Sequence, residues 1–533
     1  MRIPSLLLAL GLLVPAVAVA QGTDDDSTEE VELDEDGNPI EAEEVPPEIP
    51  RVLKRAKKEF KKKKWALASI GFFSTITKED AYFTSESRFF LAYCLDQMGL
   101  PYSALEEYNR FFEGADPQDP NIAEAVKAAV GLARRLDAGF IIAPGLSRLD
   151  TSAVSEGLRG PAMFWVGSWH LENENFTASK AYLSLVPKDT QFYARARMLE
   201  GILYIHPKNA QRNPALAIAP LAGALAAADR DAEDNTEWQV INLNLARTYY
   251  AMGNFERAIE HFEKIPRSSA LWHESLYEAS WSYFRLGRLS GALSHLQTVD
   301  SPFYDGTYHP DATLLRILLF YYLCKYIDGQ TMLNDFTDIH YPMAKEMEAA
   351  VKEARNDPTG LFKSIYAWRT SRTEDGIKLP GPIKQIFESD QDLVRVGDYL
   401  LGIDKELNRT EEIGTGWEKS KLRKDLEAAL KKRRKEATDT KGAAALAKVE
   451  NLLTSLQGHL GNAELYKVEM ITAEKNLYDA AYQGRLLDKI SKRAIDPDVP
   501  NGYRYWAFEG EYWIDELGWY EINTVNECLE VQR

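Results

Sequence analysis

After Lys64, apolar and polar residues follow the three- and four-residue spacing of amphipathic α-helices nearly throughout the chain. Residues 356–360 and 379–382 interrupt this pattern, and both stretches contain the Pro and Gly residues that end helices. The pattern therefore predicts an all-α protein.

The strongest regularity is a set of positions that recurs after 34 residues. Its first copy is Leu245, Ala246, Tyr249, Gly253, Phe255, Ala258 and Phe262, and its second copy is Ala279, Ser280, Tyr283, Gly287, Leu289, Ala292 and Leu296. Small residues let two antiparallel helices approach closely, and the glycines fall where the first helix must end. This period and pattern resemble the tetratricopeptide repeat (TPR).

Looser copies of the same pattern surround this pair, with small-residue markers at Ala104, Ser179, Ala217 and Gly329. The resemblance implies a TPR-like α-solenoid over residues 51–345, with about six to eight units. Some of these units lack the turn Gly, and Ala217 follows a lengthened connection.

Beyond residue 345 the pattern changes. Residues 346–384 are expected to form connecting helices, including one at 344–355, and residues 385–495 a module of long amphipathic helices. Leu393, Val396, Leu400, Ile403 and Leu407 form a heptad-like stripe. A second stripe, interrupted at 438–442, could pack on the first as a helical hairpin or coiled coil, or on a partner; the hairpin buries both stripes without help.

The final segment, 496–533, is rich in Trp, Tyr and carboxylates. Its Trp506, Trp513 and Ile514 have helical spacing, which favours an aromatic helix that closes the solenoid. Carboxylates beside aromatic rings are also used in glycan chemistry, so the alternative function is a cell-wall glycan-binding protein or hydrolase accessory. With the repeats and the N-terminus, this segment resembles large exported envelope TPR proteins of deltaproteobacteria, including those of gliding motility.

The N-terminus indicates export. A short basic start, an apolar run and the small residues Ala18-Val19-Ala20 are typical of a signal peptide at residues 1–20, cleaved near Ala20. Residues 21–50 are expected to be a disordered acidic leader. No later stretch is long and apolar enough to span a membrane. The expected location is the periplasm, within the cell envelope, of a Gram-negative bacterium.

Charge is unevenly distributed along the 533 residues, whose formal net charge is -18. Residues 1–50 contain thirteen acids and one base, which leaves the rest of the chain close to neutral. This balance argues against a nucleic-acid partner.

A basic patch follows the leader. Its nine bases are Arg51, Lys54, Arg55, Lys57, Lys58, Lys61, Lys62, Lys63 and Lys64. It is either the solvated face of a first helix, partly neutralised by the leader, or a peripheral contact with anionic lipid head groups or an acidic polymer.

The cysteines are few. Cys94 and Cys324 lie in apolar helical contexts and are expected to be buried small hydrophobic residues. Pairing of Cys528 with the body of the chain is left open, because spacing alone does not decide it.

Motifs for catalysis, metal binding or a cofactor are missing from the sequence, so we expect no enzyme, no metal site and no cofactor. Protein binding remains. In TPR proteins the first helix of each unit lines a concave groove. Transferred to this sequence, that rule predicts these groove residues: Leu243, Arg247, Tyr250, Tyr277, Trp281, Phe284 and Arg285. Aromatic and Arg side chains are typical of peptide-binding hot spots. The predicted function is a non-catalytic scaffold for protein–protein interactions in envelope machinery for motility, secretion or outer-membrane assembly.

Overall fold

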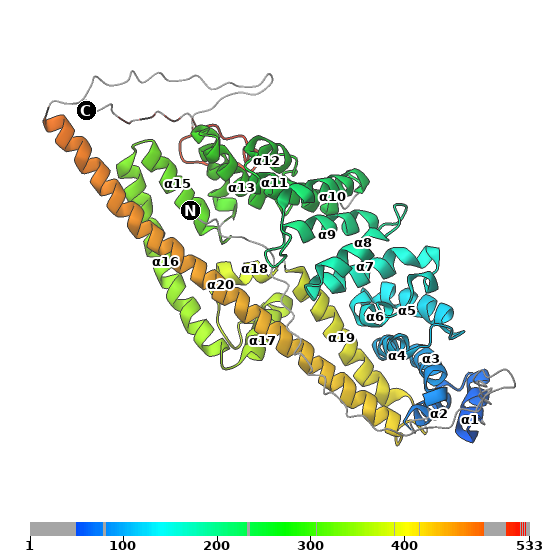
Figure 1. Ribbon diagram of the computed structural model, residues 1–533. Helices are drawn as coiled ribbons and strands as arrows, with labels where there is room; N and C mark the ends of the chain where they lie inside the picture. Colours follow the sequence, from blue (N-terminus) through cyan, green and yellow to red (C-terminus); the bar gives the residue numbers. More distant parts are fainter. Residues whose placement is uncertain are drawn as a thin grey trace, which may run out of the picture. The chain divides into compact units, whose positions relative to one another are not determined.

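The computed structural model describes residues 49–77, 81–231, 235–304, 306–388, 390–414, 416–483, 508–522, 524, 526 and 528. The predicted signal peptide, nearly all of the acidic leader and residues 484–507 lie outside this set. Within it, every regular element is a helix, as Figure 1 shows, which confirms the predicted all-α fold.

The repeat region consists of helices that pair in chain order. They are α1 (Arg51–Lys61), α2 (Trp65–Ile76), α3 (Ala81–Gln97), α4 (Pro101–Gly114), α5 (Ile122–Leu136), α6 (Gly139–Leu146), α7 (Glu156–Glu172), α8 (Phe176–Ser184), α9 (Tyr193–Ile205), α10 (Pro214–Ala227), α11 (Thr236–Ala251), α12 (Phe255–Phe262), α13 (Trp272–Arg285), α14 (Leu289–Val299), α15 (Pro310–Tyr322) and α16 (Tyr326–Ala354). Short 3₁₀ turns follow α6 and α14, at Thr151–Ala153 and Pro302–Tyr304.

One type of turn joins the two helices of nearly every hairpin. A single residue has a positive φ, between 49° and 80°, and the second helix begins two positions later. The residues in this position are Lys63, Gly99, Asp137, Glu174, Gly253, Gly287 and Cys324. The next N–H donates to a carbonyl five residues back, as in Asn254 to Tyr249 at 2.9 Å, which satisfies the end of the first helix. The predicted roles of Gly253 and Gly287 are thus confirmed, and the same turn also forms without Gly.

Small residues set the spacing of the paired helices. Ala258 and Ala292 are fully buried. A Cβ on Gly167 of α7 would lie 2.7 Å from the side chain of Leu183 on α8, so a larger residue would push this hairpin apart. The α9–α10 pair has the lengthened connection expected before Ala217, at residues 206–213.

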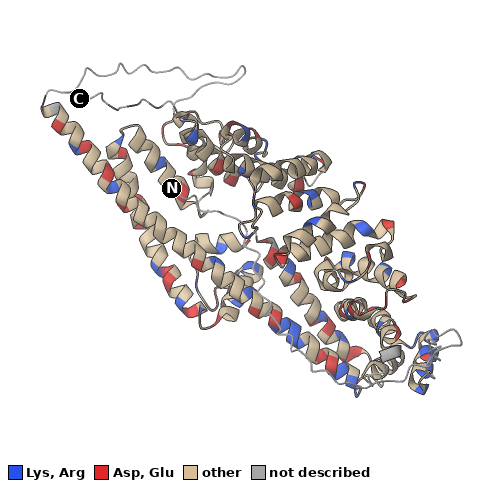
Figure 2. Ribbon diagram, in the orientation of Figure 1, with Lys and Arg blue, Asp and Glu red and all other residues tan. Residues whose placement is uncertain are grey.

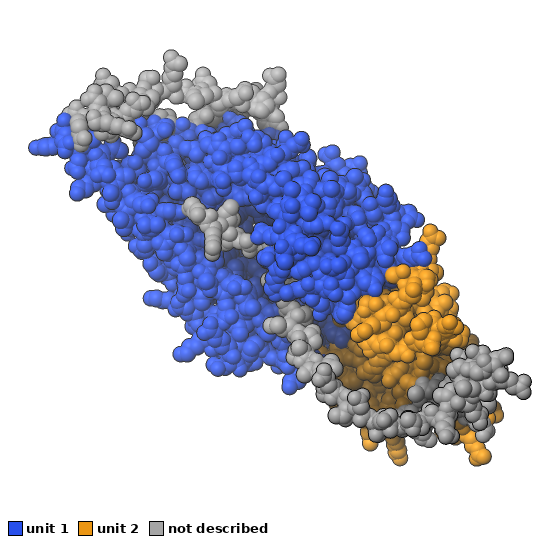
Figure 3. All heavy atoms as spheres, viewed as in Figure 1, with its two compact units in different colours: residues 1–7, 159–400, 434–533 blue, residues 8–158, 401–433 orange. Residues whose placement is uncertain are grey.

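The chain divides into two compact units, coloured in Figure 3. One contains residues 159–400 and 434–533, and the other contains the described residues up to 158 together with 401–433. The expected segments 51–345 and 385–495 therefore each contribute to both units.

Four further helices follow the repeat region: α17 (Pro358–Ser371), α18 (Gly381–Glu388), α19 (Gln391–Glu412) and α20 (Lys421–Tyr482). The interruption predicted at residues 438–442 is wrong, because α20 is continuous through it. Gly442 instead provides room: a Cβ there would lie 2.4 Å from the carbonyl oxygen of Pro358 on α17. The separate helix predicted at 344–355 is the C-terminal part of α16, which continues through Pro342.

In the unit formed by residues 159–400 and 434–533, α20 packs antiparallel on α16. Gln330 bonds to Glu474 at 2.8 Å, and Arg355, one residue past the end of α16, bonds to Glu450 at 2.7 Å. The two predicted stripes share one core with α16 and α17, in which Leu393 and Leu400 lie with Val449, Leu456 and Leu460. Intrachain packing of the stripes is thus confirmed, with α16 as the long helix that accompanies α20.

In the other unit, the end of α19 and the start of α20 pack on α4 and the turn before it. The buried carboxylate of Glu406 accepts from the backbone N–H and the hydroxyl of Ser103, the latter at 2.7 Å, in the first turn of α4. Arg433 forms an ion pair with Glu106 at 3.0 Å. The indole of Trp417, fully buried between α19 and α20, donates to the carbonyl of Thr410 at 3.0 Å.

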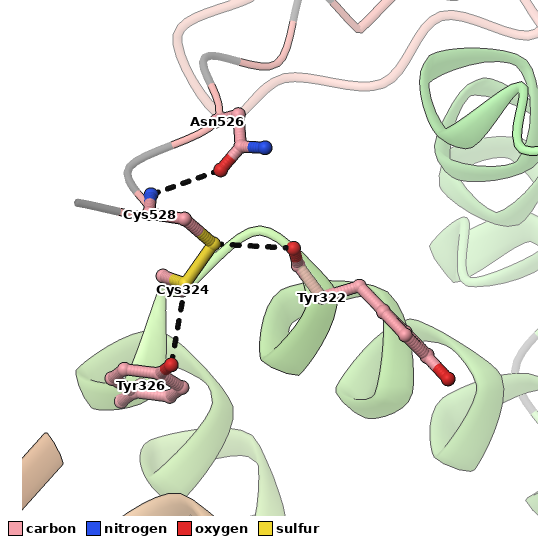
Figure 4. Close-up of a disulfide and its surroundings, with 5 residues drawn as sticks. All are labelled: Tyr322, Cys324, Tyr326, Asn526 and Cys528. Atoms are coloured by element: carbon pink, nitrogen blue, oxygen red, sulfur yellow. Dashed lines mark hydrogen bonds between the residues drawn. A yellow bond between two sulfur atoms is a disulfide. The ribbon is translucent and has the colours of Figure 1, made fainter. Parts of the chain in front are cut away.

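The aromatic C-terminal segment is not the predicted helix: residues 508–522 form turns and irregular structure. A disulfide anchors the chain just beyond it. Cys324, in the turn between α15 and α16, is bonded to Cys528, 204 positions away (Figure 4). The expectation of Cys324 as a buried small hydrophobic residue is therefore wrong, because Cys324 lies in a turn, is only half-buried and is bonded to Cys528. Cys94 is buried and free, as expected.

Candidate protein-binding site

The predicted groove residues lie on α11 and α13, the first helices of two adjacent hairpins, within one unit. Leu243 is not available to a partner, because it is 3% exposed and packs in a small core with Ala246 and Ala258. Arg285 is exposed, and the other five side chains are half-buried.

Arg247 is used within the fold. Its guanidinium donates to both carboxylate oxygens of Glu278, with Nε–Oε2 at 2.8 Å, and to Glu274 at 2.6 Å. Burial raises the pKa of Glu278, and the adjacent Arg247 lowers it in part. Arg247 therefore fastens α11 to α13 rather than offering its charge to a partner.

Tyr277 is similarly engaged. Its hydroxyl donates to Asp311 of α15 at 3.1 Å and accepts from the indole N–H of Trp281 at 3.2 Å. Burial raises the pKa of Tyr277 well above its usual value. Tyr277 thus links α13 to the next hairpin and fixes the orientation of Trp281.

The remaining side chains form two clusters, which are neighbours on α13 because Trp281 and Arg285 lie one helical turn apart. Tyr250 packs edge-on against Phe255 at 5.3 Å between ring centroids, and the Arg285 guanidinium lies 4.6 Å from the Phe255 ring. Trp281 packs on Phe284 at 6.0 Å, and Phe284 on Tyr322 at 5.6 Å. We call this surface the aromatic face; its residues are Tyr250, Phe255, Trp281, Phe284, Arg285 and Tyr322.

Phe255 and Tyr322 were not among the predicted groove residues. Phe255 begins a second helix, and Tyr322 ends a first helix whose unit is only loosely marked in the sequence. Tyr322 remains 53% exposed, which makes it the most open aromatic ring of this face. A stacked guanidinium beside several half-buried rings suits an apolar or aromatic peptide side chain with a nearby carboxylate.

One arrangement has the residue types of a catalytic triad, although the sequence did not single it out. Ser455 and Asp311 both contact His459. Both contacts involve Nε2 of the imidazole, whereas a relay needs the carboxylate on Nδ1 and the hydroxyl on Nε2. These residues therefore fasten α20 to α15 without the geometry of a nucleophile. Among the described residues, no group of three or more His, Cys, Asp and Glu is placed to hold a metal ion.

The basic patch covers α1 and the turn after it (Figure 2). Leu53 and Ala56 face inward and are buried. Lys57 is half-buried and pairs with Glu86 at 2.7 Å, while the other bases of the patch are exposed. The patch is thus the outer face of an amphipathic helix.

Comparison with known proteins supports the repeat and little beyond it. A model of the tetratricopeptide repeat matches residues 241–265, which contain most of α11, the Gly253 turn and α12. The crystal structure of the P58(IPK) TPR domain aligns with 73% of this chain and 98% of its own, at 13% identity and a TM-score of 0.17. No curated protein matched the chain.

In the part of the chain that the structure describes, no helix meets the length and hydropathy needed to cross a membrane. The Cys324–Cys528 bond is typical of an oxidising compartment. Residues 241–265 are similar to a tetratricopeptide repeat, the family that the 34-residue period indicates.

Proposed function

We propose that this protein is a non-catalytic scaffold that binds a segment of another protein on the aromatic face of α11–α15. The observation that carries the proposal is the pair of neighbouring clusters of the aromatic face, one from Tyr250 to Arg285 and one from Trp281 to Tyr322. Its rings are held in place by neighbours, so binding orders few side chains, and rigid aromatic anchors supply most of the energy at such sites.

We further propose that it works in the periplasm of a Gram-negative bacterium, as part of an envelope machinery for motility, secretion or outer-membrane assembly. The N-terminal sequence pattern and the disulfide support the compartment. The machinery follows from the resemblance to exported envelope TPR proteins alone.

Site-specific photo-cross-linking in the producing cell tests the binding face. A photoreactive phenylalanine analogue at position 284 should give a discrete cross-linked product with one partner. The matched control is the same analogue at position 264, which is exposed just after α12. Equal product patterns at the two positions, or none at 284, would contradict the proposal.

The exposed bases of α1 favour a second contact, with an anionic surface. Each Lys or Arg near an anionic membrane contributes about 1 kcal/mol, and salt screens the attraction. The protein should sediment with vesicles containing phosphatidylglycerol at low salt and be released at high salt. Replacing Lys61, Lys62 and Lys63 by Gln should abolish sedimentation, whereas sedimentation that ignores salt would argue against a charged contact.

A further inference from the structure

The C-terminal segment is bound on α13 and α14 like a peptide ligand, through its main chain. The N–H of Gly518 donates to Thr298 Oγ1 at 2.8 Å, and the N–H of Ile522 donates to Ser294 Oγ at 2.9 Å. Arg267 donates to two carbonyls of the segment, those of Ile514 at 2.9 Å and Asp515 at 3.1 Å. Main-chain contacts of this kind recognise a peptide backbone whatever side chains flank it.

Specificity comes from Leu517 and Gly518. Leu517 is 4% exposed and packs with Trp272 and Leu276 of α13, so it is the buried anchor of the segment. Gly518 has a φ of +83°, and a Cβ there would lie 2.7 Å from the Trp272 ring. The site therefore selects Leu followed by Gly.

Three large apolar side chains of the segment stay exposed although its main chain is bound. Trp513, Ile514 and Trp519 are 54–68% exposed. An open cavity of about 360 Å³ lies between the segment and α13–α14, bordered by Tyr283, Ser294, His295 and Trp519 among others. A permanent structural cap would bury such large apolar side chains and leave no space of this size.

A disulfide also holds the segment near this surface. Cys528 lies six residues after Ile522 and is bonded to Cys324 in the next hairpin, so the segment is tethered close to its site. A tether of this kind gives the segment a high effective concentration at the site and excludes weaker competitors.

We propose that this surface of α13 and α14 is a second protein-binding site, occupied in cis by residues 511–522. When residues 511–522 leave the site, it binds a segment of a partner protein in which Leu-Gly precedes aromatic residues, as in Leu517-Gly518-Trp519-Tyr520. The site uses Arg267, Trp272, Leu276, Ser294 and Thr298, none of which belongs to the aromatic face, so it does not rest on the function proposed above.

Fluorescence anisotropy with a labelled peptide of residues 508–524 tests this site. The full chain is used in two forms, the oxidised wild type and an opened variant carrying Cys324→Ser, Leu517→Asp and Cys528→Ser. The opened variant should bind the peptide at least about tenfold more tightly, because its own segment has lost both anchor and tether. A Leu517→Asp peptide should lose about tenfold or more in affinity, whereas an Ile514→Ser peptide, changed at an exposed position, should bind as before.

Equal affinity of the two chains for the peptide would overturn the proposal. Loss of folding in the opened variant, seen by circular dichroism, would overturn it as well, since the segment would then be a fixed part of the core. A concentration-dependent dimer of the Cys324→Ser, Cys528→Ser chain that disappears with Leu517→Asp would support the site, with a second copy as its occupant.

Discussion

Arg247 of α11 and Glu278 of α13 form a two-point ion pair between adjacent repeat units, with Nε–Oε2 at 2.8 Å and Nη2–Oε1 at 2.5 Å. The guanidinium matches both carboxylate oxygens, and Glu274 accepts from the same Arg. The residue that the repeat template assigns to partner binding thus holds the repeats together.

Arg247→Ala should therefore act on stability. It leaves two partly buried carboxylates facing each other, which costs about 2–3 kcal/mol of unfolding free energy. Arg257→Ala is the matched control, because Arg257 makes an exposed pair with Glu260 at 3.3 Å and should cost less than about 0.5 kcal/mol. Urea unfolding of both variants checks this; equal stabilities would contradict the structural role of Arg247.

The shared hairpin turn predicts a reciprocal pair of substitutions. Gly253 has a φ of +78°, with open space around its Cβ position, so Gly253→Ala should cost about 1 kcal/mol through backbone strain alone. Lys63 occupies the same turn position with a φ of 57°, so Lys63→Gly should stabilise the protein by about the same amount. If both variants shifted the melting temperature in the same direction, the two turns would not be equivalent and the prediction would fail.

Ala258 tests the close approach of α11 and α12. It is fully buried in a small core with Leu243, Ala246 and Phe262. Ala258→Leu should destabilise the protein by about 1–3 kcal/mol through overpacking. Ala251→Leu, at an exposed position of α11, is the control and should be nearly neutral. A neutral Ala258→Leu in chemical denaturation would mean that the repeat register is wrong.

The two clearest repeat units could be predicted because their turns use Gly and their contacts use Ala, and both residue types leave a sequence signal. Glu174 and Cys324 make the same turn at a cost in strain that the packed helices overcome, so nothing in their identity marks a turn. The opposite holds for Gly442, which lies in the interruption predicted at residues 438–442. α20 is continuous there and needs Gly442 for contact with Pro358, which no local pattern reveals.

Only part of the candidate site could be predicted from the sequence. The template placed Tyr250, Trp281 and Phe284 on one face because helix periodicity fixes which side chains share a side. It could not show that Arg247 has two carboxylate partners on the next helix, nor that Cys528 returns over 204 positions to Cys324. Both depend on contacts between segments whose spacing in the sequence carries no information about them.

Glu406 should make stability depend on pH. Burial raises its pKa from 4.5 to about 7, despite hydrogen bonds from Ser103 and Tyr102 and the charge of Arg433 that lower it. Between about pH 4.5 and pH 7, the Glu406 carboxyl is therefore protonated in the folded state and ionised in the unfolded state. The stabilisation is complete below about pH 4.5 and is lost as the pH rises through 7, by up to about 3 kcal/mol.

Unfolding of the full chain at about pH 5 and pH 8 checks this. Glu406→Gln should remove most of the difference between the two conditions, while Glu411→Gln, at an exposed position of the same helix, should preserve it. A Glu406→Gln chain with the wild-type pH profile would show that another group is responsible.

The most direct test of the binding scaffold is Trp281→Ala, read out in the position-284 cross-linking strain alongside thermal unfolding of the purified chain. Trp281 is half-buried, with its indole held by Tyr277 and its ring beside Phe284, so truncation removes the centre of the aromatic face. We expect at least a tenfold loss of the cross-linked product with a melting temperature lowered by only a few degrees. A large drop in melting temperature with undiminished cross-linking would contradict the account, because Trp281 would then serve only the packing of the repeats.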